Sequence, residues 1–240
     1  MTVNNSSRRP IVRRAVVGLA TASLLVSACG SSDDSGSDDG TTEDTTGDTA
    51  SSGTDTPTTD DAATDEVQQN RPVSVEGAPL VPYDATLPAD PAVGEAAPVV
   101  SGESFDGTPV TIGGATGSPT LAVFLAHWCP HCNEEVPQLI ELEDSGEFPE
   151  GLEVIGVSTA VDPSGENFPP SEWIVDKGWP FATMADDEEL TAMTAMGGTS
   201  FPFLVVLDAD GNVLARRAGS APAAETKAFL DEALANQGAA

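Results

Sequence analysis

The amino-acid sequence predicts an α/β fold with a central mixed β-sheet flanked by helices. Two continuous apolar runs, residues 120–126 and 152–161, are typical of strands that are buried on both faces of a sheet. A helical pattern follows each run, beginning near Pro130 and near Pro170. Residues 201–219 contain two further apolar runs joined by an Asp-Gly turn, which indicates an antiparallel hairpin. The sheet should therefore combine parallel and antiparallel strands.

The first element of the folded part is expected to be an N-terminal β-hairpin. Folding should begin near Ala92, and short runs of β-forming residues flank the turn residues 106–109. The helix that begins near Pro130 places three apolar residues on one face: Val136, Leu139 and Ile140. Its other faces carry acids: Glu134, Glu135, Glu141 and Glu143.

Three more helices are expected along the rest of the chain. Residues 170–178 should form a short helix that ends at a glycine. Residues 186–196 should form another, with its acids in the first turn, where the helix dipole favours negative charge. We expect these acids to be a solvated face, not a calcium site, because they lack EF-hand spacing. The last helix begins at Pro222 and should bury one apolar face: Phe229, Leu230, Ala233 and Leu234.

Residues 1–28 are expected to be an export signal of the lipoprotein type. Four arginines and no acid precede an apolar run, 15–28, that is short for a membrane span. The sequence LVSACG at residues 25–30 resembles the lipobox of bacterial lipoproteins, which implies cleavage before Cys29 and attachment of lipid acyl chains such as palmitate to it. The protein should then be anchored on the outer face of the bacterial cytoplasmic membrane. The arginine pair Arg8–Arg9 leaves the twin-arginine and general export routes both open.

Residues 29–91 are expected to be a disordered tether that begins with the lipidated Cys29. Residues 31–66 contain twelve acids, no base, no aromatic residue and no aliphatic side chain larger than alanine. Such a segment cannot bury enough apolar area to offset its conformational entropy, and a Pro-rich stretch continues it to Pro91. In all, 39 acids and five bases follow residue 28, a net charge of −34. This charge repels phosphate, so the sequence excludes nucleic acid as a partner.

Two cysteines lie in the sequence LAHWCPHCNEEVP, residues 125–137, where the first buried strand meets the first helix. Crossover rules place Cys129 at the carboxyl end of that strand, where α/β sheets carry their sites. Unpaired N–H groups at the helix start stabilise a thiolate there, and Pro130 suits the first turn. His131 adds a donor or a positive charge. Cys132, one turn later and facing inward, should resolve mixed disulfides, so the pair is expected to form a redox-active disulfide.

This segment resembles the active-site segment of the thioredoxin superfamily. Trp128 precedes the cysteine pair, and Pro137 follows the second cysteine by five residues. The sequence GGTSFPF, residues 197–203, resembles the cis-proline loop of that superfamily. The resemblance implies a thioredoxin fold over residues 92–240, with Pro202 in cis against the cysteine pair and its neighbouring backbone pairing with bound substrate. It is strongest for the membrane-tethered, TlpA/ResA-like thiol–disulfide oxidoreductases.

Two positions differ from the pattern of that superfamily. Val123 stands where thioredoxins carry a buried acid that relays protons, and Phe201 precedes Pro202 where a smaller residue is usual. We expect Phe201 to shape the substrate groove together with Trp128. The Pro-His pair resembles that of strongly oxidising proteins, whereas the rest of the chain resembles reductases. The direction of exchange, oxidant or reductase, is therefore left open.

The expected activity is disulfide exchange with cysteine-containing exported proteins by a monomer that needs no organic cofactor and no metal. A membrane redox partner, which the sequence does not identify, should regenerate it. The main alternative is a copper carrier, because a cluster of cysteines and histidines suits a soft ion: His127, Cys129, His131 and Cys132. Two further alternatives are a peroxide-reducing enzyme, although Ala126 replaces the threonine it would need, and an inert structural disulfide.

Overall fold

A mixed eight-stranded sheet organises the part of the chain that the computed structural model describes, residues 67–237. The strands run in the order β1–β2–β6–β5–β4–β7–β8, and β3 pairs with β2. The strands are β1 Ser74–Glu76, β2 Val99–Glu103, β3 Pro109–Ile112, β4 Thr120–Leu125, β5 Glu153–Ser158, β6 Ala182–Ala185, β7 Phe203–Leu207 and β8 Val213–Ala218. The helices are α1 Pro130–Ser145, α2 Pro170–Asp176, α3 Thr191–Ala195 and α4 Ala223–Ala235. Strands β4, β5 and β6 are parallel, and β7 is antiparallel to β4, which confirms the predicted mixed sheet.

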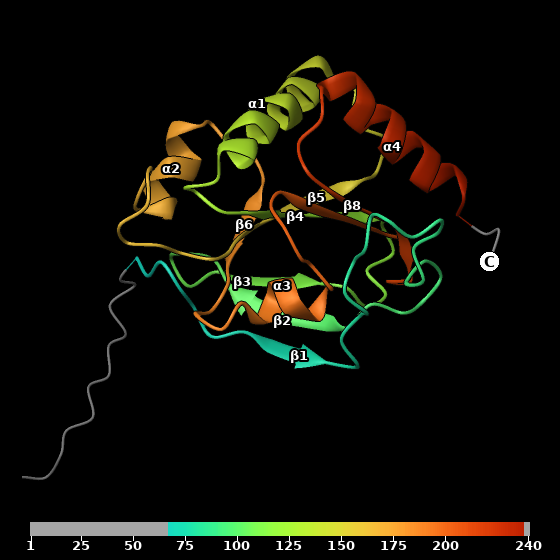
Figure 1. The fold of residues 1–240 in the computed structure, drawn as a ribbon, viewed down its shortest axis with the longest axis horizontal. Helices are drawn as coiled ribbons and strands as arrows, with labels where there is room; N and C mark the ends of the chain where they lie inside the picture. Colours follow the sequence, from blue (N-terminus) through green and yellow to red (C-terminus); the bar gives the residue numbers. More distant parts are fainter. Residues whose placement is uncertain (1–66, 238–240) are drawn as a thin grey trace, which may run out of the picture. The chain divides into compact units, whose positions relative to one another are not determined.

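The central strand β4 is buried on both faces because a layer of structure covers each. Leu121, Val123 and Leu125 belong to the core beneath α1, α2 and α4. The alternate residues Ala122 and Phe124 belong to a second core on the side of α3. Figure 1 shows α1, α2 and α4 on one side of strands β4 and β5, and α3 with β1, β2 and β3 on the other. A strand with two buried faces is a continuous apolar run, so the sequence identified β4 correctly.

The other predicted elements are confirmed except at one helix. The hairpin β2–β3, strand β5, helices α1, α2 and α4, and the hairpin β7–β8 all form where the sequence places them. Strands β1 and β6 were not expected, and both are only three or four residues long. The helix expected over residues 186–196 is restricted to α3, so its acidic residues lie before the helix.

Asp186, expected on a solvated helix face, is instead completely buried. Its carboxylate accepts hydrogen bonds from the backbone N–H groups of Ala192 (2.8 Å) and Met193 (3.2 Å), and from the hydroxyl of Thr159 (2.8 Å). Burial raises the pKa of this carboxyl, although these hydrogen bonds oppose the rise. Asp186 therefore caps the start of α3 from a distance and ties it to the end of β5.

Residues 67–91, which we name the strap, were expected to belong to the disordered tether, and this expectation is wrong. Strand β1 of the strap pairs with β2 in an antiparallel ladder. The N–H of Leu80 donates to the carbonyl of Ala195 (2.9 Å), and the N–H of Tyr83 donates to the carbonyl of Gly197 (2.8 Å). Leu80 is buried in the core on the α3 side. The folded region therefore includes the strap and does not begin near Ala92.

A buried ion pair fastens the strap to β8. The guanidinium of Arg216 donates to both carboxylate oxygens of Asp90, at 2.8 and 2.6 Å. Its remaining nitrogen donates to the carbonyls of Val81 (2.9 Å) and Met196 (3.1 Å). Burial raises the pKa of Asp90, but the hydrogen bonds from Arg216 and Ala92 and the charge of Arg216 outweigh it, so the pKa is lowered. The strap is thus held by contacts that a disordered tether would not make.

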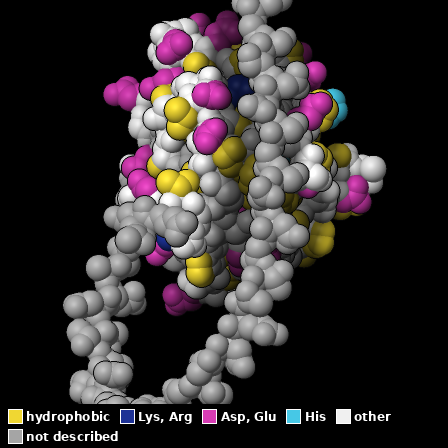
Figure 2. Space-filling model, turned by 90° about the vertical axis from the view of Figure 1, so that its left-hand side faces the viewer, with side chains coloured by type: hydrophobic (Ala, Val, Ile, Leu, Met, Phe, Trp, Pro, Cys, Tyr) yellow, Lys and Arg dark blue, Asp and Glu magenta, His cyan; other side chains and the backbone are white. Residues whose placement is uncertain are grey.

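The predicted export signal, Cys29 and residues 31–66 of the predicted tether lie outside the described residues. Between residues 67 and 237, no helix combines the length and the apolar character that crossing a membrane requires. Figure 2 shows one face of the molecule, where acidic side chains are scattered among hydrophobic ones and basic side chains are few. Basic side chains are few on this face because residues 67–237 contain only five of them.

Candidate active site

Cys129 lies just after the carboxyl end of β4, at the N-cap position of α1. Pro130 occupies the first turn, and no side chain caps this end of the helix. The first N–H groups of α1 are therefore not taken by a capping side chain, and the positive end of the helix dipole faces Cys129. Cys129 is 7% exposed. The local sequence thus builds the strand-to-helix junction that was predicted for the nucleophile.

Cys132 lies one turn further along α1 and is completely buried. The backbone N–H of Ala126 donates to its sulfur at 3.4 Å. Burial raises the pKa of the Cys132 thiol strongly, and the neighbouring Cys129 and the charge of Glu135 raise it further, against the opposing Ala126 hydrogen bond. Both cysteines are free thiols. The pair is therefore asymmetric: the outer Cys129 keeps a small exposed fraction, whereas the inner Cys132 has none.

The loop before β7 contacts the outer cysteine. The peptide bond between Phe201 and Pro202 is cis, and the thiol of Cys129 donates to the carbonyl of Phe201 at 3.8 Å. The ring of Phe201 packs edge-on against Trp128, with 6.0 Å between the ring centroids. Trp128 remains 36% exposed. The residues that the sequence singled out for the substrate groove therefore lie together beside the Cys129 sulfur.

The two histidines occupy different environments. His131 is exposed and forms a hydrogen bond with Glu134 at 3.3 Å, which lowers the pKa of Glu134. His127 is completely buried, and its Nδ1 lies 2.7 Å from the carbonyl oxygen of Glu166. The backbone N–H of Asp162 points at its Nε2, at 3.2 Å. Because a carbonyl can only accept and an N–H can only donate, Nδ1 carries the proton and Nε2 accepts.

This assignment removes His127 from the four residues on which the copper-carrier alternative was based. Both ring nitrogens of His127 are engaged, so neither offers a lone pair to a metal ion. Across residues 67–237, no three His, Cys, Asp or Glu side chains are grouped so that they could hold a metal. His127 is instead a structural residue that holds the loop of residues 160–169 against the segment before Cys129.

The loop of residues 160–169 is a part of the site that the sequence did not indicate. Its Ala160 carbonyl accepts a hydrogen bond from the indole of Trp128 (2.7 Å), and its Asn167 side chain donates to the carbonyl of His127 (2.9 Å). Ala160 and Asn167 both have left-handed backbone angles, with φ of 53° and 61°. Such angles are costly for residues other than glycine, and they occur here where the loop contacts the active-site segment.

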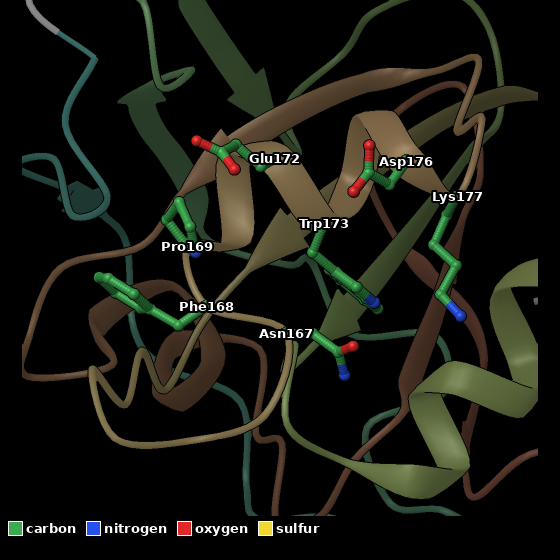
Figure 3. Close-up of a pocket in the computed structure, with 7 residues that line it drawn as sticks. All are labelled: Asn167, Phe168, Pro169, Glu172, Trp173, Asp176 and Lys177. Atoms are coloured by element: carbon green, nitrogen blue, oxygen red, sulfur yellow. The ribbon is translucent and has the colours of Figure 1, made fainter. Parts of the chain in front are cut away.

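A pocket of about 300 Å³ adjoins this loop, on the side of α2 (Figure 3). Residues from the loop and from α2 line it: Asn167, Phe168, Pro169, Glu172, Trp173, Asp176 and Lys177. The Phe168 ring is 44% exposed and packs edge-on against His127, with 6.0 Å between the centroids. Two exposed aromatic rings are therefore associated with the loop: Trp128, which bonds to its Ala160 carbonyl, and Phe168, which belongs to it.

Glu135 is a second feature of the site that sequence reasoning missed. It was assigned to a polar face of α1, but its side chain is completely buried. Its carboxylate pairs with Arg217 (2.9 Å) and accepts the backbone N–H of Ala221 (2.8 Å). Burial raises its pKa, although the Ala221 N–H and the charge of Arg217 oppose the rise. The signal was available, because Glu135 follows Cys132 by three residues and so shares its helix face.

We expect Glu135→Gln to lower the pKa of Cys132, because it removes a negative charge that raises it. The thiolate absorbance of the reduced protein should then begin to rise at a lower pH during alkaline titration.

The substitution Glu135→Gln should also change how the stability of the protein depends on pH. Burial raises the pKa of Glu135 above its unfolded value, so its protonation stabilises the fold at low pH, and this contribution is lost as the pH rises through the folded pKa. In Glu135→Gln the stability of the fold should no longer include this contribution from Glu135 protonation.

Glu134→Gln is the matched control, because the neighbouring Glu134 is exposed and bonds only to His131 and Ser220. It should leave the Cys132 titration unchanged. Identical alkaline titrations of Glu135→Gln and the wild type would show that the charge of Glu135 does not reach Cys132.

One protein-family model and several solved structures are similar to this chain. The Redoxin family model matches residues 92–234. No curated protein was found to match the chain. Among solved structures, the chain is similar to StoA from Bacillus subtilis, with 22% identity, a TM-score of 0.46 and coverage of 58% of this chain and 98% of that one. It is also similar to a thioredoxin-family thiol:disulfide interchange protein from Chlorobium tepidum, with 26% identity, a TM-score of 0.48 and coverage of 61% and 99%.

The match to the family model spans more than half of the chain and includes both cysteines, the cis-proline loop and every strand from β2 to β8. Only the strap and β1 of the described elements precede it. The element order and the mixed sheet are those of the thioredoxin fold, as the sequence predicted. The chain therefore belongs to the Redoxin family, and it is an oxidoreductase of the thioredoxin superfamily.

Proposed function

We propose that this protein exchanges disulfides with the cysteine pairs of exported proteins through its Cys-Pro-His-Cys segment. One observation carries the proposal. Cys129 lies at the uncapped start of α1 beside a cis-proline loop, while Cys132 is buried one turn below it. In this arrangement the outer sulfur would exchange with the client and the inner sulfur would resolve the product.

In the reducing direction, the Cys129 thiolate attacks one sulfur of a client disulfide. The client S–S bond breaks, a bond forms between Cys129 and that client sulfur, and the other client sulfur leaves and takes up a proton. The Cys132 thiolate, having released its proton, then attacks the Cys129 sulfur, so the second client thiol leaves and the Cys129–Cys132 disulfide forms. Two electrons and two protons pass to the client. The oxidising direction is the reverse of these steps.

The neighbouring residues have supporting roles in the proposal. Trp128 and Phe201 form the apolar wall that receives the client chain, and the backbone beside Pro202 pairs with it as an additional strand. Pro130 and His131 adjust the reduction potential through the first turn of α1. General-base help for Cys132 comes from water or from a group other than residue 123, since Val123 is apolar and buried.

We further propose that the protein acts outside the cytoplasm as a lipid-anchored monomer. Residues 1–28 would be the export signal, Cys29 the lipidated residue, and the acidic segment of residues 31–66 the tether. A membrane redox partner would regenerate the active form. Cells grown with labelled palmitate should label the wild type and not Cys29→Ala, and the variant should leave the membrane fraction. Equal labelling of the two would contradict the anchor.

The activity is tested by equilibrating the purified protein in a graded glutathione buffer. The fraction of the Cys129–Cys132 disulfide, measured by mass spectrometry of the trapped protein, should follow a two-electron transition. A reduction potential of about −120 mV would identify an oxidant, and one of about −270 mV would identify a reductase. A cysteine pair that does not equilibrate with glutathione at any ratio would overturn the proposed function.

A further inference from the structure

The side chain of Asn133, in the first turn of α1, holds the backbone on both sides of Trp128. Its Nδ2 donates to the carbonyl of His127 (3.1 Å) and to the carbonyl of Cys129 (3.0 Å). The indole Nε1–H of Trp173 donates to its Oδ1 at 3.0 Å. Both donors and the acceptor of the amide are therefore used. The orientation of the amide is settled, because the reverse orientation would place its oxygen against two carbonyl oxygens.

The residues that position Asn133 come from the crossover between β5 and β6. Trp173 belongs to α2 and is only 4% exposed, so without Asn133 its N–H would be a buried donor with no partner in this network. The His127 carbonyl also accepts the side chain of Asn167, so two amides hold it from different elements. Trp173 and Asn167 both line the pocket shown in Figure 3.

The presence of asparagine here has no local explanation. Asparagine is a weaker helix former than alanine, because its side chain competes with the backbone for hydrogen bonds. Asn133 therefore lowers helix stability at this position, yet its amide donates hydrogen bonds to the backbone carbonyls of His127 and Cys129. The orientation of that backbone determines where the Cys129 sulfur lies relative to the first N–H groups of α1, and so how strongly they stabilise the thiolate.

We propose that Asn133, oriented by Trp173, is a positioning residue that keeps the Cys129 sulfur at the amino end of α1 and thereby maintains its thiolate. This proposal rests on the proposed function, since it assigns a role in the same exchange reaction. Asn133 does not touch the substrate. It acts through the two carbonyl groups that flank Trp128.

The test measures the rate at which iodoacetamide alkylates Cys129 in the reduced full-length protein as a function of pH. The peptide that contains Cys129 is followed by mass spectrometry, so that other cysteines do not contribute. In Asn133→Ala the alkylation profile should move to higher pH, so that alkylation of Cys129 below the midpoint slows about tenfold. Asn133→Asp, which keeps the acceptor for Trp173 and replaces the two donors by an acidic oxygen, should shift it further in the same direction.

Gln138→Ala is the matched control, because Gln138 is a second amide on α1 that binds a backbone group, the N–H of Ala223 (2.9 Å). It should lower stability toward urea without moving the alkylation profile. Trp173→Phe removes only the N–H donor and should move the profile in the same direction as Asn133→Ala. The double variant Asn133→Ala/Trp173→Phe should shift it no further than Asn133→Ala, since the two residues act as one unit.

An alkylation profile of Asn133→Ala that matches the wild type would overturn the proposal and leave Asn133 a structural residue only. If Asn133→Ala fails to fold, the alkylation profile of Trp173→Phe tests the proposal instead, because the phenylalanine ring preserves most of the packing. A profile of Trp173→Phe that matches the wild type would then overturn the proposal. A wild type that exchanges no disulfide would refute the proposed function, whereas the alkylation contrast would still decide the role of Asn133.

Discussion

Replacing Cys132 by serine should turn the protein into a trap for its clients. The outer Cys129 can still attack or be attacked, but no inner thiol remains to resolve the mixed disulfide. Client proteins should therefore accumulate as covalent adducts, visible on non-reducing gels of cells that express the variant and released by reductant. The effect is large because Cys132 lies one turn below Cys129, and residues 67–237 contain no other cysteine that could resolve the adduct.

Replacing Cys129 by serine should have the opposite outcome on the same gels. No adduct should form, and disulfide exchange should fall on the order of 10³-fold or more, as for the loss of a nucleophile that no neighbour replaces. The double variant Cys129→Ser/Cys132→Ser controls for adducts through other sites. If Cys132→Ser traps no client, or if Cys129→Ser traps as many, the assignment of outer and inner sulfur is wrong.

A chain that begins at residue 92, the boundary suggested by the sequence, should be much less stable than one that begins at residue 67. Deleting the strap removes Asp90 and leaves the guanidinium of Arg216, whose side chain is completely buried, without its counter-ion. Breaking a buried ion pair in this way typically costs about 3–5 kcal/mol. The deletion also removes β1 and the buried Leu80. Urea unfolding of the two chains measures the difference.

The point variant Asp90→Asn isolates the ion pair, and Asp84→Asn is its control in the same strap. The carboxylate of Asp84 is exposed and, within residues 67–237, bonds only to Thr86, so its replacement should change stability little. Because the pKa of Asp90 is lowered on folding, its contribution is present above the ordinary value of 3.8 and is lost as the pH falls through the folded value. The stability difference between the wild type and Asp90→Asn should shrink accordingly. Equal unfolding of the two chain lengths would refute the role of the strap.

Most of the fold was predictable because its signals are local. A strand buried on both faces is a run of apolar residues, so β4 and β5 are visible in the sequence without knowledge of their neighbours. The hairpin β7–β8 is likewise marked by its Asp-Gly turn. The short strands β1 and β6 were missed because three or four residues carry no clear periodicity.

The environment of individual charged residues was not predictable. Glu135 lies among the acids of α1, and its burial depends on distant partners, Arg217 and Ala221, which lie 82 and 86 residues away. Asp186 is buried because β5 and α3 supply donors to its carboxylate. The strap is Pro-rich and follows an acidic segment with few apolar side chains, and its attachment depends on Arg216, which lies 126 residues after Asp90.

The sequence by itself determined the pairing of two thiols at the start of a helix, since four consecutive residues contain both sulfurs and the proline of the first turn. It also determined the order of the strands and helices that carry them. Only the tertiary structure decided what surrounds the thiols: the engaged ring of His127, the amide of Asn133 and the buried carboxylate of Glu135. The physical reason is distance along the chain. A thiol pair one helical turn apart is a local arrangement, whereas hydrogen bonds and ion pairs between distant segments exist only after those segments have packed together.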